Sequence, residues 1–507
     1  MNKRNKRLLS AALLGLLVFA GGCESGRGRE GDQLIVAQNG EPVTLDPHRT
    51  NDARSAVVIN QIMERLIRQD EDGALHPMLS TGWRQIDELT YEFDIREGVY
   101  FHNGEPLRAS DVAFSLKRAA SSPTSAPILG IINEAAVEVV DDFTVRVGTY
   151  EPFIPLLSHL AHTSGNIMSQ VAVEAYGDAF GQNPVGTGSF KFEGWQQGDR
   201  VELVRFEDYW GTPSGTERLT VRNIPEAANR LIELETGMVD IALEIAPSDV
   251  AALEANNDLN LIREANLRSH YIGFNVTQTP LNDVRVRQAI NYAIDTDLII
   301  SSILEGVGIR ANGPMSNDIW GAYPNLRPYD FNLERSLELL AEAGFANGFE
   351  TSILTDLDNT NRAIAEVLQQ KLQDIGISST IQSVEWAQFL EITGAGTHDI
   401  FITGWTSVTR DADYGLFPLF HSSNVGAGGN RAFYSNPVVD SLLEEARQER
   451  DEARRAELYV EIQEILVEDA PWVFLYIGEI LIGTNGNVRN FRANPSGHHR
   501  FSEVALD

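Results

Sequence analysis

The stretch YEFDIREGVYFHNGEPLRASDVAFSLKR occupies residues 91–118. At its start Tyr91, Phe93 and Ile95 alternate with polar residues, the period-two pattern of a strand with one buried face. A second alternation runs over residues 137–147, on both sides of the pair Asp-Asp, and predicts a β-hairpin. The first part of the chain is therefore expected to be rich in short strands.

Outward from this stretch the pattern changes along the chain. Upstream, LIVAQNGEPVTLDPH (34–48) predicts a strand and a turn-rich segment, and apolar spacing predicts a helix over 51–67. Beyond residue 280 helices alternate with strands, beginning with LNDVRVRQAINYAIDTD (281–297). Such alternation predicts α/β layers with largely parallel pairing. The further helices are expected over 333–341, 364–375 and 450–468, and the strands over 400–402 and 472–477.

Length and charge limit the classes of protein to consider. The 507 residues exceed what a single core needs and allow two or three lobes. The chain has 40 basic and 72 acidic residues, a formal charge of −32. This acid excess argues against nucleic acid or an anionic membrane surface as a partner. Adaptation to high salt and genomic base composition both remain open as its cause.

The N-terminus has the organisation of an export signal. Basic residues 3–7 precede an apolar run over 8–20, too short to span a membrane. Small residues then precede Cys23, the only cysteine, so no intrachain disulfide can form. This resembles a lipoprotein signal, with residues 1–22 removed, Cys23 acylated and residues 23–32 a flexible tether. Ala20 stands where such signals commonly have leucine, which leaves simple secretion open.

Motifs for catalysis or cofactor binding are absent from the sequence. It contains no GxxxxGK[ST] phosphate loop, no GxSxG nucleophile elbow and no HExxH zinc motif. His159 and His162 have helical spacing but no evident partner ligand, so we interpret them as an ordinary helical pair. We therefore expect neither a metal nor a cofactor, although these absences alone indicate only a secreted α/β protein.

A series of segments points to one family. They are GEPVTLDPH (40–48), DEDGALHPMLSTGW (70–83), residues 91–118, NPVGTGSF (183–190), RFEDYWG (205–211), LETGMVDIA (234–242), YIGFNVTQTPLNDVRVRQAINYAID (271–295), LLAEAGF (339–345), GW (404–405) and AFYSNPVVD (432–440). Their number and order resemble the bacterial extracellular solute-binding proteins of family 5, the oligopeptide-, dipeptide-, nickel- and glutathione-binding group. The stretch 404–420 is most similar to that of the glutathione- and dipeptide-binding members.

The resemblance implies a bilobal α/β clamp, the type II periplasmic-binding-protein fold or Venus flytrap, with an extra sub-lobe in the first lobe. On this basis the first lobe is expected over 33–279, with the sub-lobe over about 67–185. The second lobe is expected over 280–484, and residues 485–507 should return to the first lobe.

The resemblance also implies a function without catalysis. The protein would bind peptides (di- or oligopeptides, or a glutathione-like peptide) outside the cytoplasmic membrane, close its lobes over them and deliver them to an ABC permease with its ATPase subunits. It would be a monomer held at the membrane through lipid. Two alternatives remain open: a binding protein for a nickel chelate, haem, an opine or an oligosaccharide, and a secreted hydrolase.

Candidate ligand contacts follow from the same resemblance. In the family an acidic residue soon after the GW pair meets the ligand's α-amino group, but the position three after Trp405 is Val408 here. Asp411, and next Asp413, are the nearest acids, although either could only cap a helix or face solvent. Trp405 could lie flat against the ligand or belong to the core. The remaining candidates are Arg410 and Arg362 for a carboxylate, Thr187 within NPVGTG, and Asn275 and Glu41.

Overall fold

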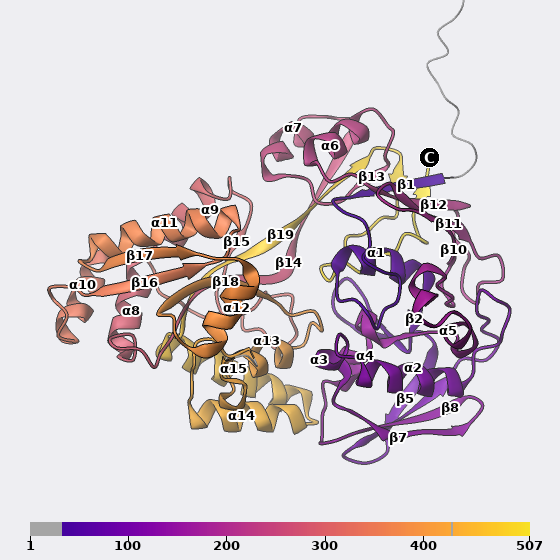
Figure 1. Cartoon of the computed structure of the whole chain (residues 1–507), viewed down its shortest axis with the longest axis horizontal. Helices are drawn as coiled ribbons and strands as arrows, with labels where there is room; N and C mark the ends of the chain where they lie inside the picture. The colour runs from indigo at the N-terminus through magenta and orange to yellow at the C-terminus, as the bar shows by residue number, and fades with distance from the viewer. Residues whose placement is uncertain (1–32, 427–428) are drawn as a thin grey trace, which may run out of the picture.

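The computed structural model describes residues 33–426 and 429–507. In this part of the chain two lobes lie side by side (Figure 1) and share one eleven-stranded sheet. The strand order is β10-β11-β12-β1-β13-β19-β14-β18-β16-β17, with β15 beside β19. In that order the bounds are Phe190–Gln196, Arg200–Arg205, Arg218–Asn223, Gln33–Gln38, Ile241–Ala242, Trp472–Asn485, Leu259–Phe274, Ile400–Thr406, Glu350–Thr355 and Ser378–Ser383, and β15 is Ile309–Arg310.

Two long strands connect the lobes. β14 has 16 residues and β19 has 14, and they pair antiparallel from Leu259 opposite Asn485 to Gly273 opposite Trp472. The register shifts between Ala265 and Ser269, close to the middle of the pair. Each of these strands belongs to both lobes, so neither strand marks a single point where one lobe ends. The boundaries expected at 279/280 and 484/485 stay predictions.

The first lobe contains a second, four-stranded antiparallel sheet in the order β5-β6-β8-β7. The strand predicted at Tyr91 is β6, and the predicted hairpin is β7 and β8, with Val139 opposite Val145. α2 (Ala109–Ser121) packs against β7 and buries Val112 and Leu116. The strand bounds are Ser80–Gln85, Thr90–Ile95, Thr144–Thr149 and Ile132–Asp141.

The helix predicted over 51–67 is shorter than expected. α1 spans Ala53–Ile62, with the Asp52 carboxylate accepting a hydrogen bond from the Ser55 N–H at its start. Met63 is extended, and β2 (Glu64–Arg65) and β3 (Ile67–Gln69) follow. The spacing of apolar residues did not reveal the end of the helix at Ile62, because the pairing of β2 with β9, distant in the sequence, ends it.

The second lobe alternates helices with strands as predicted. β16 pairs in parallel with β17 and β18, and α11 (Asn359–Asp374) and α12 (Trp386–Ala395) connect them. The prediction of largely parallel pairing was wrong for the other strands, since β18 is antiparallel to β14, and β14 and β15 are antiparallel to β19. The helix predicted around 281–297 is α8 (Val284–Ala293), and its buried face includes Val286 and Ile290. The others are α9 (Thr296–Ser302), α10 (Leu333–Glu342), α13 (Ala412–Phe420), α14 (Pro437–Gln448) and α15 (Glu452–Asp469).

The chain ends in the first lobe. β20 (Val488–Arg489) pairs with β21 (Ala505–Leu506), and Phe501 is buried beside strands β1 and β12 in the first-lobe core. The other short elements there are α3 (Ala126–Leu129), α4 (Leu156–Leu160), α5 (Gln170–Tyr176), α6 (Ala227–Glu235), α7 (Val250–Glu254), β4 (Leu75–Pro77) and β9 (Asn166–Ile167).

Among residues 33–426 and 429–507, no helix combines the length and apolar character needed to cross a bilayer. The predicted signal over 1–22, Cys23 and the tether lie outside the described residues.

A buried arginine holds the second lobe together. Arg287, 6% exposed, donates hydrogen bonds from Nε to Asp469 O (3.0 Å) and from Nη1 to Leu281 O (2.8 Å). Burial lowers the pKa of its guanidinium, which nevertheless stays charged at neutral pH. The side chain thus satisfies carbonyl groups at the end of α15 and in the segment before α8.

We expect Arg287→Met to lower the free energy of unfolding by about 3 kcal/mol, because buried carbonyls lose their donors. Arg285→Met, an exposed change on the same helix, should cost less than about 1 kcal/mol. Urea unfolding measures both variants. Equal losses would contradict the role given to Arg287.

Candidate functional site

The segment after β18 faces the first lobe. β18 lies between β14 and β16 in the sheet, with Trp405 opposite Ser269 of β14, and the chain continues from its carboxyl end into α13. From this segment Val408 and Tyr414 pack against the sub-lobe core that contains Leu66 and Leu160. Ligands of α/β proteins commonly bind beyond the carboxyl ends of strands, so this is the part of the second lobe to consider first.

Arg410 joins this segment to the first lobe. It has φ +57, a left-handed conformation that residues other than glycine rarely adopt. Its guanidinium, in a side chain 2% exposed, donates to Asp70 O (2.8 Å) and Glu71 O (3.0 Å) in the turn between β3 and β4. Burial lowers its pKa. Two of its donor groups are therefore already used by backbone carbonyls. The role predicted for Arg410 with a ligand carboxylate stays a prediction.

Asp411 caps the start of α13 and forms a buried ion pair. Its two carboxylate oxygens accept hydrogen bonds from Arg455 at 2.6 and 2.8 Å. The ring of Trp320 covers the guanidinium at 4.5 Å. Burial acts to lower the pKa of Arg455, but the charge of Asp411 outweighs it and the pKa is raised. An amine-binding role for Asp411 stays a prediction, and would have to share the carboxylate with Arg455.

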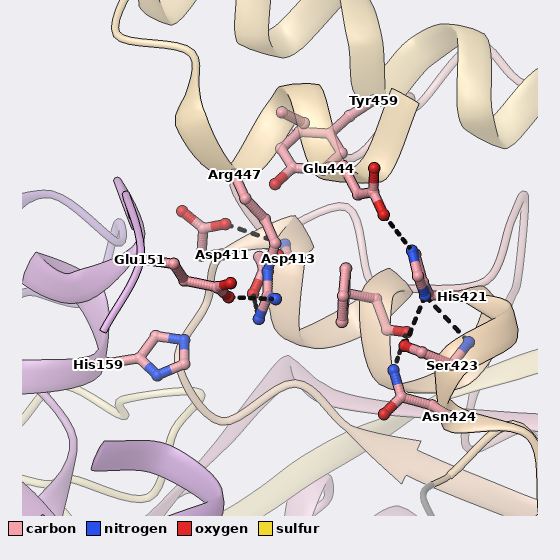
Figure 2. Close-up of polar contacts among 12 residues, drawn as sticks. Glu151, His159, Asp411, Asp413, His421, Ser423, Asn424, Glu444, Arg447 and Tyr459 are labelled. Atoms are coloured by element: carbon pink, nitrogen blue, oxygen red, sulfur yellow. Dashed lines mark hydrogen bonds and ion pairs between the residues drawn. The ribbon is translucent and has the colours of Figure 1, made fainter. Parts of the chain in front are cut away.

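Asp413 belongs to a second contact between the lobes (Figure 2). Its carboxylate accepts from Arg447 Nε at 2.9 Å, and Glu151 of the first lobe lies 3.5 Å from the same guanidinium. The Arg447 carbonyl accepts a hydrogen bond from the Ile154 N–H (2.9 Å). The guanidinium also lies over the ring of Phe153, at 5.0 Å. Charge, backbone and ring contacts therefore meet at one arginine.

A cavity of about 430 Å³ lies between these two contacts. From the first lobe it is lined by Gln69, Gly73, Ala74, Leu75, Ile154, Leu157 and Ser158. From the second lobe it is lined by Trp320, Arg410, Asp411, Glu449, Arg450, Glu452 and Arg455. The walls combine apolar side chains with charges of both signs, a suitable lining for a small zwitterionic solute.

The remaining candidates lie apart from this cavity. The half-buried Trp405 donates from its indole N–H to Tyr414 O at 2.9 Å. Thr187 is buried and donates to the Glu64 carboxylate, and buried Asn275 donates to Gly396 O and His398 O. Exposed Glu41 accepts from the Gly198 N–H, and Arg362 is exposed on α11. The ligand-binding roles of all five stay predictions.

The sequence did not indicate Arg447, Arg455 or Trp320. The two arginines lie on α14 and α15, where charged residues are ordinary, and they meet partners 34 and 44 positions away in the chain. Only the packing of these helices beside α13 brings the charges together.

The two histidines considered for metal binding are not the helical pair that was predicted. His159 lies in α4, whereas His162 follows it in an extended conformation, with its Nδ1 3.1 Å from the Ser164 hydroxyl. His159 Nδ1 lies 2.6 Å from Ile128 O, and burial lowers the pKa of its ring. Among the described residues no group of three or more histidine, cysteine or acidic side chains is arranged to hold a metal ion.

Residues 74–427 match the family model described as "Bacterial extracellular solute-binding proteins, family 5 Middle". The chain belongs to this family. It is 32% identical over 484 residues to the Glutathione-binding protein GsiB of Salmonella typhi, covering 93% of this chain and 94% of the relative. The resemblance seen in the sequence is therefore confirmed.

Two solved structures of family relatives have the same fold. HbpA2 from Haemophilus parasuis superposes with a TM-score of 0.87 at 31% identity, over 94% of this chain and all (100%) of that one. The periplasmic binding protein DppA from Helicobacter pylori, in complex with peptide STSA, gives 0.77 at 29% identity, over 94% and 98%. These likenesses confirm the predicted type II periplasmic-binding-protein fold. Family members are extracytoplasmic solute-binding proteins.

Asp411→Asn should lower the free energy of unfolding by about 3 kcal/mol, since it leaves the buried Arg455 charge without its carboxylate. Asp413→Asn should cost about 1 kcal/mol, because Arg447 keeps Glu151 and is 20% exposed in its side chain. Urea denaturation compares them. The double variant Asp411→Leu with Arg455→Met removes both charges and should therefore be more stable than Asp411→Asn. If the double variant instead loses as much stability as the two single changes added together, the pairing of Asp411 with Arg455 is contradicted.

Proposed function

We propose that this protein captures a peptide outside the cytoplasmic membrane and delivers it to an ABC permease. The observation that carries the proposal is the cavity of about 430 Å³ lined by residues of both lobes. The named relatives support it: one is called a glutathione-binding protein, and another has the peptide STSA bound. Dipeptides, short oligopeptides and glutathione-like peptides are the solutes we expect.

Capture needs only closure of the lobes. β14 and β19 permit opening and shutting, and their register shift at Ala265–Ser269 places an irregularity where bending would occur. A solute stabilises the closed form only by touching both lobes at once. The turn before Leu75 and the segment around Arg410 offer such paired contacts. We propose no covalent chemistry, and hence a binding protein and not an enzyme.

The test is direct binding to the intact protein. Native mass spectrometry of protein purified without refolding should show one retained solute per chain. Calorimetry with glutathione and trialanine should then detect binding, and small-angle scattering should show a smaller radius of gyration with solute. Absence of binding to both probes, with an unchanged radius, would contradict the proposal. Hydrolysis of trialanine would favour the enzyme alternative.

We also propose that Cys23 is acylated and holds the protein at the outer face of a membrane. The support is the position of this only cysteine after an apolar run and two glycines. Cys23→Ser should move the protein from the membrane fraction to the soluble fraction of lysed cells, whereas Ser25→Ala should leave it with membranes. A Cys23→Ser protein that still sediments with membranes would overturn the anchor.

A further inference from the structure

A second cavity, in the first lobe, gathers positive charge. Its lining includes Arg65, Arg68 and Arg500, together with Glu64, His498 and Gln69. Three arginines at one site contrast with the formal charge of −32 of the whole chain. Arg65 comes from β2, Arg68 from β3 and Arg500 from the returning C-terminal segment, so only the folded first lobe assembles this arginine cluster.

Arg65 is the buried member of the cluster. It is 7% exposed, and Nη1 donates to the Asn60 side-chain oxygen at 3.2 Å. Its Nε has no hydrogen-bond partner, and no carboxylate of the described residues lies within ion-pair distance. Burial lowers the pKa of its guanidinium to about 10, so the group stays charged at neutral pH. The charge of Glu64 favours the protonated form and that of Arg500 opposes it. A buried guanidinium without a hydrogen-bonded carboxylate is costly.

The other two arginines bring further positive charge to the cavity. The side chain of Arg68 is half-buried and makes no hydrogen bond or ion pair within residues 33–426 and 429–507. Burial and the charge of Arg500 lower its pKa, whereas the carboxylates of Asp70, Glu503 and Glu71 act in the opposite direction without pairing with it directly. Arg500 pairs with Glu503 at 2.6 Å, but both side chains are exposed to solvent at 38% and 54%.

Glu64, the carboxylate of the cavity, is directed elsewhere. Its oxygens accept hydrogen bonds from Thr187 (2.8 Å), Tyr209 (2.7 Å) and Trp210 (2.8 Å). Burial raises its pKa, whereas the three hydrogen bonds and the charge of Arg500 act to lower it. Its charge also acts through space on Arg65, but it makes no hydrogen bond to an arginine of the cluster. Burial also lowers the pKa of the neighbouring His498 well below its ordinary value, so this ring adds no charge at neutral pH.

The cavity is small and lies beside the space between the lobes. Its volume is about 30 Å³, and a water molecule needs about 10–15 Å³, so there is room for about two water-sized groups. Gln69 lines both this cavity and the larger one, and its side-chain amide lies 3.5 Å from Thr409 O of the second lobe. A functional group of a solute, but not a whole peptide, fits here.

We propose that Arg65, Arg68 and Arg500 form an anion subsite that takes a carboxylate of the captured solute. The proposal rests on the function proposed above and adds to it a preference for solutes with a free carboxylate. Guanidinium groups match the two oxygens of a carboxylate, and Arg65 and Arg68 would gain the hydrogen-bonded carboxylate that the described residues do not give them. A solute reaching it would contact the first lobe while the second lobe closes.

The test compares two probes on three forms of the intact protein. Glutathione carries two carboxylates, and glutathione diethyl ester has both of them esterified. We expect Arg68→Gln to weaken glutathione binding roughly tenfold or more, the effect of losing one charge-assisted contact, and to leave the affinity for the diester unchanged. Arg489→Gln, which removes an equal charge from an exposed residue of the C-terminal segment, should bind both probes as the wild type does.

Arg68→Gln should not lower the thermal midpoint of the solute-free protein, because its side chain makes no hydrogen bond or ion pair within the described residues. This separates a binding role from a structural one. If Arg68→Gln and Arg489→Gln bind glutathione equally, or if Arg68→Gln weakens both probes by the same factor, the subsite is overturned while the proposed function stands. A wild-type protein that binds neither glutathione nor trialanine would overturn both.

Discussion

The antiparallel pairing of β14 with β19 is the constraint on which the rest of the structure depends. These strands give the first lobe its connection to β13 and the second lobe its connection to β18. Backbone hydrogen bonds along the pair resist sliding and separation, whereas a sheet bends and twists at lower cost. The lobes therefore stay joined along one side, and the freedom that remains is rotation about this pair.

Opposite this hinge, arginine side chains make the contacts between the lobes. Arg410 binds carbonyl oxygens of the Asp70–Glu71 peptide groups, and Arg447 connects Glu151 with Asp413. A guanidinium suits such places because it stays charged when buried and has five donors in a rigid plane. The same property explains Arg287 within the second lobe.

The site differs from the family pattern where a ligand amine is expected. Val408 packs against the sub-lobe core, and Asp411 is engaged by Arg455. The negative charge near this end of the cavity is thus largely neutralised within the second lobe. Guanidinium groups without a hydrogen-bonded carboxylate lie instead in the first lobe, at Arg65 and Arg68, within the part of the chain that the structure describes. If the first lobe binds a carboxylate of the solute, the second lobe would contact the remainder of that solute.

The sequence by itself determined the fold class and most of the elements. Alternation at Tyr91, Phe93 and Ile95 predicted a strand, and the spacing of Val286 and Ile290 predicted a helix, because each pattern reports one buried face of a local element. It also gave the family, through many short segments in a fixed order. It failed where a distant partner decides, as at Glu64 and Arg65, whose pairing with β9 ends the predicted helix. Only the tertiary structure decided which charged groups of the site are paired. Whether Asp411 faces a solute or Arg455, and whether the Arg68 side chain has a partner, depends on side chains that are far away in the chain. Local sequence patterns contain no information about such contacts.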